Sequence, residues 1–248
     1  MKTVSELKVK IFADGADKKG ILEMLQQTYI KGFTTNPTLM RKAGISNYEA
    51  FAKDILKFVS HHPISFEVFS DDFSEMYDQA MQIAQWGKNV YVKIPVTNTA
   101  GKSAAKLISS LAKAGVKQNV TALMTLDQVR EVTEALAGGP AACISVFAGR
   151  IADTGCDPLP IMKESLKIMQ PHSQLELIWA SPRELLNIFQ ADEIGCHIIT
   201  VTNDILKKLS LVGKNLNEYS LETVEMFYRD ALSAGYQLST EQPVEEAL

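Results

Sequence analysis

Eight short apolar runs recur along the chain, each followed by a longer segment with apolar residues three or four positions apart. The runs are typical of buried strands, and the longer segments are typical of amphipathic helices. The predicted strands lie at 8–14, 32–36, 63–69, 89–95, 117–123, 142–148, 174–180 and 196–201. This alternation predicts crossover units and a parallel sheet. Eight units favour an α/β fold of the (β/α)8 TIM-barrel type, with a doubly wound open sheet as the alternative, because sequence alone does not show closure.

Three predicted helices carry a start signal. The tetrapeptides at 46–49 (SNYE), 125–128 (TLDQ) and 181–184 (SPRE) each match a capping box. In the third, Pro182 takes the favoured first helical position. The helix after 46–49 is predicted to bury one face, which consists of Tyr48, Phe51, Ala52, Ile55, Phe58 and Val59.

The chain shows no internal repeat and no linker that would divide it. Two helices are expected after the last strand, at 203–209 and near 221–232. A length of 248 residues fits one undivided barrel. We therefore predict a single catalytic barrel domain over residues 1–235 and a C-terminal tail over residues 236–248.

Composition narrows the class of protein. Hydrophobic residues make up 46% and charged residues 22%, which is ordinary for a globular protein, and the net charge of −4 gives no reason to expect nucleic acid or an anionic membrane as a partner. Three widely spaced cysteines do not form the pattern of a disulfide framework, and none is expected. Neither a signal peptide nor an apolar stretch of membrane-spanning length is visible, so the expected location is cytoplasmic. The His61–His62 pair has no further ligand at metal-binding spacing, and no metal is expected.

Lys93 stands out because it interrupts an apolar strand. In the run Tyr91–Val96 (YVKIPV), alternation places Val92 and Ile94 on one face and Lys93 on the other. A lysine in such a strand is partly desolvated, which disfavours its charged form. A neutral amine attacks carbonyl groups and forms Schiff bases. The alternative is a lysine whose stem covers apolar surface while its ammonium reaches water.

Other predicted strands also carry polar residues near their C-terminal ends, where barrel enzymes place their active sites. Asp14 ends the first strand, and Glu67 lies in the third between Phe66 and Val68; the others are Thr34, Asn36, Asn119, Thr121 and Ser145. Each has a structural alternative: Asp14 and Asn36 are common turn residues, and Glu67 is a natural ion-pair partner for Lys93. Their joint occurrence at strand ends favours one catalytic site.

At these positions the chain resembles the transaldolase family. The segments that carry the resemblance are FADGAD, GFTTNPTLM, SFEVF, VYVKIPVT, NVTAL, SVFAGRIAD, WASPRE and GCHIITVT. They span nearly the whole chain in the family's order, and TTNPT and VKIPVT are the most specific. The resemblance implies a (β/α)8 barrel and a class I aldol enzyme that needs no cofactor and whose lysine lies on the fourth strand. Lys93 lies on the fourth predicted strand.

The resemblance also implies a role for each catalytic residue. Lys93 forms the Schiff base with the ketose carbonyl. Asp14 is the general acid/base on the hydroxyl whose proton loss breaks the carbon–carbon bond. Glu67 and Thr121 hold the catalytic water.

The implied binding residues fall into two groups. Asn36 and Asn119 position the dihydroxyacetone unit, and Thr34 and Ser145 line the same site. Residues that bind the substrate phosphate are Arg150, Ser181 and Arg183. From local sequence, Ser181 is equally suited to cap the next helix, and Arg150 to lie on the surface.

Two positions indicate which reaction of the family applies. Glu67 and Phe147 resemble the transferring enzymes, whereas fructose-6-phosphate aldolases usually carry glutamine and tyrosine there. The expected function is transfer of a dihydroxyacetone unit from sedoheptulose 7-phosphate or fructose 6-phosphate to glyceraldehyde 3-phosphate or erythrose 4-phosphate, as in the non-oxidative pentose phosphate pathway. The alternatives are an aldolase that releases dihydroxyacetone and a non-catalytic barrel that binds sugar phosphates. The resemblance further implies a homo-oligomer, a pentamer or decamer.

Overall fold

The computed structural model describes residues 2–238. These form two compact units, Lys2–Ser210 and a second that begins at Leu211. The strands of the first unit are β1 (Lys10–Asp14), β2 (Ile30–Thr34), β3 (Ile64–Glu67), β4 (Val90–Pro95), β5 (Gln118–Leu123), β6 (Ala142–Val146), β7 (Leu175–Trp179) and β8 (Ile198–Thr202). Its helices are α1 (Lys18–Leu25), α2 (Pro37–Lys42), α3 (Tyr48–Leu56), α4 (Phe73–Ala84), α5 (Ala105–Lys113), α6 (Leu126–Leu136), α7 (Ala148–Asp153), α8 (Leu159–Met169), α9 (Leu186–Glu193) and α10 (Asn203–Leu206). The 3₁₀ helices are η1 (Val4–Glu6) and η2 (Lys207–Leu211).

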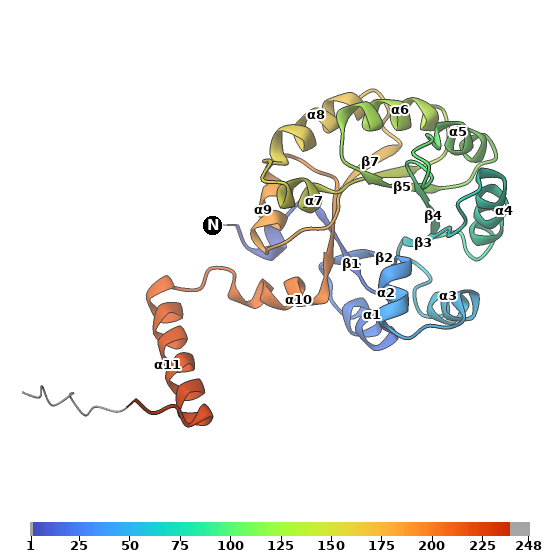
Figure 1. The fold of residues 1–248 in the computed structure, drawn as a ribbon. Helices are drawn as coiled ribbons and strands as arrows, with labels where there is room; N and C mark the ends of the chain where they lie inside the picture. The colour runs from blue at the N-terminus through green and yellow to red at the C-terminus, as the bar shows by residue number, and fades with distance from the viewer. Residues whose placement is uncertain (1, 239–248) are drawn as a thin grey trace, which may run out of the picture. The chain divides into compact units, whose positions relative to one another are not determined.

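The eight strands close into a barrel in sequential order, as predicted. Every neighbouring pair is parallel, and β1 pairs with β8 from Lys10↔Ile198 to Asp14↔Thr202. The open sheet is therefore ruled out. Helices surround the strands, with α4, α5, α6 and α8 along one side of the barrel (Figure 1).

Strand alternation divides the buried residues into an outer and an inner layer. The outer layer packs strands against helices and includes Val92 and Ile94 of β4. The inner layer fills the barrel and consists of Phe12, Cys143, Ile178, Ala180 and Ile198, with Tyr91 and Phe147 against it. A Cβ added at Gly32 would lie 2.5 Å from the Phe12 ring, so only glycine lets that ring fill the space beside β2.

The apolar residues of the inner layer come mainly from β1, β6, β7 and β8, while every strand except β7 also has polar inward residues toward its C-terminal end. Ser65, Lys93, Asn119 and Thr121 are buried there. The apolar cluster thus fills the barrel beneath a layer of polar residues at the strand ends.

Of the three predicted helix starts, one is confirmed and two are wrong. The capping box at Thr125 is confirmed at the start of α6. The box at 46–49 is wrong, because Asn47 caps α3 by accepting a hydrogen bond from the Ala50 amide. Of the face predicted for this helix, Ala52, Ile55 and Val59 are fully buried, but Phe58 is exposed.

The box at 181–184 is also wrong. Ser181 has a φ of 59°, and α9 begins only at Leu186 without a side-chain cap. The residues between form a turn in which the Asn187 side chain accepts hydrogen bonds from the Arg183 and Glu184 amides. Ser181 and Pro182 therefore belong to a loop over the barrel mouth.

The second unit contains helix α11 (Leu216–Ala234), which is longer than the predicted 221–232. Asn215 caps its start, and Gly235 ends it with a φ of 66°. The domain limit at residue 235 stays a prediction, and most of the predicted tail, residues 239–248, lies outside the described residues. Among the helices of residues 2–238, none has the length and apolar composition to cross a membrane.

Candidate active site

A cavity of about 710 Å³ opens at the C-terminal ends of the strands. Its size suits a small organic substrate. All twelve predicted site residues line it: Asp14, Thr34, Asn36, Glu67, Lys93, Asn119, Thr121, Ser145, Phe147, Arg150, Ser181 and Arg183. The fold therefore gathers into one place residues that are far apart in the sequence.

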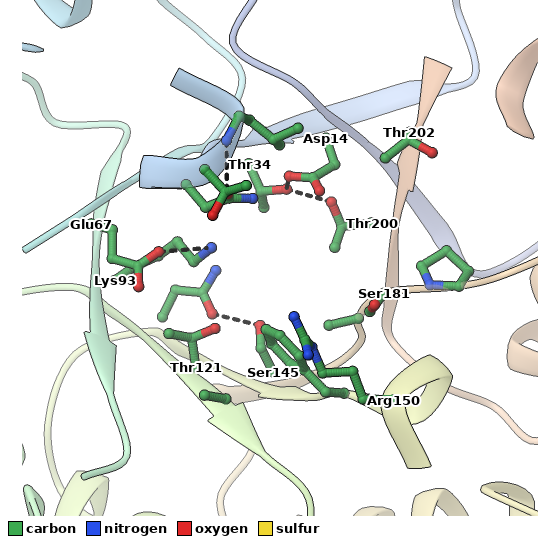
Figure 2. A pocket seen from close by; sticks show the side chains of 18 of the residues that line it. Asp14, Thr34, Glu67, Lys93, Thr121, Ser145, Arg150, Ser181, Thr200 and Thr202 are labelled. Carbon is green, nitrogen blue, oxygen red and sulfur yellow. Dashed lines mark hydrogen bonds and ion pairs between the residues drawn. The ribbon is translucent and has the colours of Figure 1, made fainter. Parts of the chain in front are cut away.

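Lys93 lies buried in the wall of this cavity, with 6% of its surface exposed. Its Nζ donates to the Thr35 carbonyl oxygen at 2.9 Å and lies 3.4 Å from Glu67 Oε2. Glu67 and Lys93 are register partners on β3 and β4, which explains why their side chains meet (Figure 2). The carbonyl oxygen of Thr35 and the carboxylate of Glu67 both face Lys93 Nζ. The amine thus has a base beside it that can take its proton.

Glu67 is held in place from outside the barrel. Its amide donates to the Tyr48 hydroxyl at 2.7 Å, and the same hydroxyl donates to the Glu67 carbonyl oxygen at 2.8 Å. Strands β2 and β3 pair only at Phe33↔Ile64 and Thr34↔Ser65, so the end of β3 extends beyond its pairing with β2. Tyr48 satisfies the backbone groups that β2 does not reach.

Asp14 belongs to a chain of side chains across β1, β2 and β8. Its Oδ1 accepts a hydrogen bond from Thr34 Oγ1 at 2.7 Å, and Thr34 Oγ1 lies 2.5 Å from Thr200 Oγ1 (Figure 2). Burial raises the pKa of Asp14, and the charge of Lys93 and the Thr34 hydrogen bond counteract this rise. A carboxyl group with a raised pKa is suited to both accept and return a proton.

Asn119 is fixed by two hydroxyl groups. Its Nδ2 donates to Ser65 Oγ at 3.0 Å, and Ser145 Oγ donates to its Oδ1 at 2.7 Å. The hydrogen of Ser145 is therefore already used. Asn36 is fixed differently, since it caps α2 by accepting from the Leu39 amide at 2.9 Å. Its Nδ2 hydrogens are the groups available to a ligand.

Thr121 and Ala122 occupy an irregular end of β5. The register with β6 shifts between Val120 and Leu123, and Ala122 has a φ of 67°. A left-handed conformation is costly for a residue with a Cβ and is concentrated at functional sites. Thr121 Oγ1 is buried without a hydrogen-bond partner among the described residues. It has the capacity to bind a water or a substrate hydroxyl.

Arg150 and Arg183 differ in their surroundings. The Arg183 guanidinium binds Asp153 through Nε to Oδ1 at 2.9 Å and Nη2 to Oδ2, and this pair lowers the pKa of Asp153. The Arg150 guanidinium lies 5.9 Å from the centroid of the Phe147 ring and has no ion pair within residues 2–238. Arg150 is therefore the freer cation of the two.

Gly149 allows the start of α7 to lie close to the loop that contains Ser181. A Cβ at this position would lie 1.6 Å from the Ser181 carbonyl oxygen, which only glycine avoids. The start of α7 thus packs directly against the loop after β7, and Arg150 and Ser181 line the same part of the cavity.

Comparison with known sequences identifies the family. The family model described as Transaldolase/Fructose-6-phosphate aldolase matches residues 11–242. The chain belongs to this family.

The names of similar curated proteins agree with this family assignment. The chain is 35% identical over 202 residues to a probable transaldolase of Dehalococcoides mccartyi, covering 81% of this chain and 90% of that one. It is 34% identical over 224 residues to a probable transaldolase of Thermoanaerobacter sp., covering 90% and 98%. A probable transaldolase 2 of Listeria monocytogenes is 34% identical, with coverage of 81% and 88%. These relatives support an enzyme of the aldolase type.

Solved structures share the fold at much lower sequence identity. A putative lyase/mutase from Burkholderia cenocepacia superimposes with a TM-score of 0.57 at 12% identity and covers 94% of this chain and 86% of that one. 3-Keto-L-gulonate-6-phosphate decarboxylase from Vibrio cholerae gives 0.53 at 10% identity, with coverage of 79% and 88%. At such identities the likeness concerns the barrel alone.

Several lining residues of this family member were not predicted from its sequence. Among these are Thr200, Thr202 and Asp204. Ser65, a buried hydroxyl residue of β3, does not line the cavity but accepts a hydrogen bond from the cavity residue Asn119. Strand alternation gives a signal for Ser65, two residues before Glu67 on the same face. Within the described part of the chain, no group of three or more His, Cys, Asp and Glu side chains is arranged to hold a metal ion.

Proposed function

We propose that this protein is a transaldolase that moves a dihydroxyacetone unit from a ketose phosphate to an aldose phosphate through a Schiff base on Lys93. The observation that carries this proposal is the placement of Lys93 Nζ, buried at the cavity wall 3.4 Å from Glu67 Oε2. A buried amine beside a carboxylate is suited to nucleophilic attack on a carbonyl carbon.

The first half of the reaction joins the sugar to the enzyme. Glu67 takes a proton from the Lys93 ammonium, and the free amine attacks the ketone carbon, forming a C–N bond. The resulting hydroxyl group then leaves as water and an iminium forms. A water held by Glu67 and Thr121 carries the protons, which is supported by the buried Thr121 hydroxyl, since it has no hydrogen-bond partner within residues 2–238.

The second half breaks the carbon–carbon bond. Asp14 takes the proton of the hydroxyl on the carbon beyond that bond, and the bonding electrons move into the iminium to leave an enamine. The aldehyde product departs. Attack of the enamine on an acceptor aldehyde, with return of the proton from Asp14, reverses these steps. The raised pKa of Asp14 supports this double role.

Binding follows from the same geometry. The Asn36 amide hydrogens and the fixed Asn119 side chain are placed to hold the hydroxyl groups of the three-carbon unit. Arg150 is the principal phosphate ligand, and Ser181 adds a polar group at the same corner. Arg183 contributes to a lesser degree, because Asp153 already occupies its guanidinium.

Transfer, rather than release, is proposed from Glu67 and Phe147. A carboxylate holds the ion pair with Lys93, and a phenyl ring at position 147 offers no hydroxyl to hold a water beside the enamine. The test supplies fructose 6-phosphate as donor with a panel of aldose phosphates. We expect transfer to an acceptor to exceed release of free dihydroxyacetone many times over. Equal rates with and without acceptor would instead identify a fructose-6-phosphate aldolase.

We also propose that the protein works as a homo-oligomer of five or ten subunits. Helix α11, taken by itself, has no buried residue and exposes large apolar side chains along its length: Leu221, Val224, Phe227, Tyr228 and Leu232. Such a surface is typical of protein contacts. Light scattering on the purified protein tests this, and a monomer at micromolar concentration would contradict it.

A further inference from the structure

The side chain of Thr200 has no assigned role, although it contacts the acid/base network. It lies on β8 opposite Phe12 of β1, one inward-facing position below Thr202, which pairs with Asp14. Only 7% of its surface is exposed, and it lines the cavity. Its hydroxyl oxygen lies 2.5 Å from Thr34 Oγ1, so the two groups share a hydrogen bond.

Counting hydrogens fixes the direction of this bond. A threonine hydroxyl has one hydrogen to donate. Thr34 donates its hydrogen to Asp14 Oδ1 at 2.7 Å. The bond between Thr34 and Thr200 therefore uses the hydrogen of Thr200, and the order of donation runs from Thr200 to Thr34 to Asp14 (Figure 2).

We infer that Thr200 is a positioning residue for the acid/base step. Its donation turns the Thr34 hydroxyl so that the hydrogen of Thr34 points at Asp14 Oδ1. One carboxyl oxygen is thereby occupied, and Oδ2 is left to take and return the proton of the substrate hydroxyl. This inference rests on the proposed function, because it assigns Asp14 the proton transfer.

The chain of hydroxyls also stabilises the charged form of Asp14. Hydrogen bonds in series strengthen one another in a low-dielectric site. The Thr34 bond opposes the rise in the pKa of Asp14 that burial causes. Loss of the Thr200 hydrogen weakens that bond, so the pKa of Asp14 is expected to rise further. Since cleavage needs the carboxylate, the acid limb of the pH–rate profile then moves to higher pH.

Other charged groups around Asp14 stay unchanged in this comparison. Lys93 acts on it from β4, and Glu67 of β3 lies beside Lys93. The remaining charged groups of the two cavities that Asp14 lines are Asp17, Lys42, Arg150, Arg183 and Asp204. A shift seen after a change at Thr200 is therefore attributable to the hydroxyl chain.

The test compares Thr200→Val, Thr200→Ala and Thr200→Ser with the wild type. Turnover of fructose 6-phosphate with an aldose phosphate acceptor is measured across pH, and adduct formation on Lys93 is measured by borohydride trapping. For Val and Ala we expect a kcat about tenfold lower, an acid limb raised on the order of half a pH unit, and unchanged trapping. Thr200→Ser keeps the hydroxyl donor and is expected to have the kcat and the pH–rate profile of the wild type.

A matched control is Thr133→Val, since Thr133 is buried on α6 and does not line the cavity. Circular dichroism checks that each variant folds. If Thr200→Val does not fold, the result for Thr200→Ala, which has the smaller side chain, tests the inference. The inference is overturned if Thr200→Val and Thr200→Ala keep the wild-type pH–rate profile, or if Thr200→Ser loses as much turnover as Thr200→Val. It is also overturned if adduct trapping on Lys93 falls together with turnover. A wild type that forms no adduct would instead overturn the proposed function.

Discussion

Replacing Asp14 by asparagine separates the two halves of the proposed reaction. Asparagine keeps the shape of the side chain and an Oδ1 that accepts from Thr34, so the hydrogen bond of 2.7 Å has a replacement. Lys93, Glu67 and Thr121 are untouched. Only the group that takes the substrate proton is lost.

The expected loss is large because Asp14 is the proposed general base of the cleavage step. General bases contribute about 10²- to 10⁴-fold to rate. We expect kcat to fall about 10³-fold, equivalent to about 4 kcal/mol of transition-state stabilisation. In the wild type, activity should decline as the pH falls through a pKa above the usual aspartate range, because the carboxylate is the active form.

Mass spectrometry after borohydride reduction provides the assay. With fructose 6-phosphate, the wild type should carry the reduced three-carbon unit on Lys93, the product of cleavage. Asp14→Asn should carry the reduced intact hexose phosphate instead. A three-carbon adduct that accumulates in this variant at the wild-type rate would refute the role of Asp14.

Three further predictions concern stability and binding. Asp192 accepts hydrogen bonds from the Lys2 ammonium and two backbone amides, so Asp192→Ala should lower the free energy of unfolding by about 3 kcal/mol in urea titration. Burial raises the pKa of Asp192, but these hydrogen bonds outweigh burial, so the pKa of Asp192 in the folded protein is lowered. The stabilisation is therefore present above the pKa of unfolded aspartate and is lost as the pH falls through the pKa of the folded state. An acid-unfolding midpoint that is identical in both proteins would contradict this. Thr133→Val should raise the melting temperature, because the Thr133 hydroxyl is buried without a partner within the described residues; a lower melting temperature would show that it has one. Arg150→Ala should raise KM for a phosphorylated donor about 10- to 100-fold and leave an unphosphorylated donor little affected, and equal effects on both would exclude phosphate binding there.

Much of the barrel follows from the sequence because strand period and strand count are local signals. Alternation on β4 separates Lys93 from Val92 and Ile94, and the structure confirms that division. The strand-end rule then places Asp14 and Glu67 beside the same cavity.

The misses arise where tertiary contacts outweigh local signals. Ser181 begins a good capping sequence, but its carbonyl packs against Gly149, and it adopts a left-handed conformation instead of capping a helix. In the sequence alone, Thr200 has the features of an ordinary β-branched strand residue. Its link to Thr34 depends on which strands become neighbours when the barrel closes, and the two residues are 166 positions apart.

The central claim is that Lys93 is the amine that condenses with the ketose. Borohydride reduction in the presence of fructose 6-phosphate, followed by peptide mass mapping of all lysines, tests it most directly, with Lys93→Met as the control that keeps the buried stem. The account predicts one modified residue, Lys93, and no adduct and no turnover in a folded Lys93→Met protein. An adduct on another lysine, or turnover that persists in that variant, would contradict it.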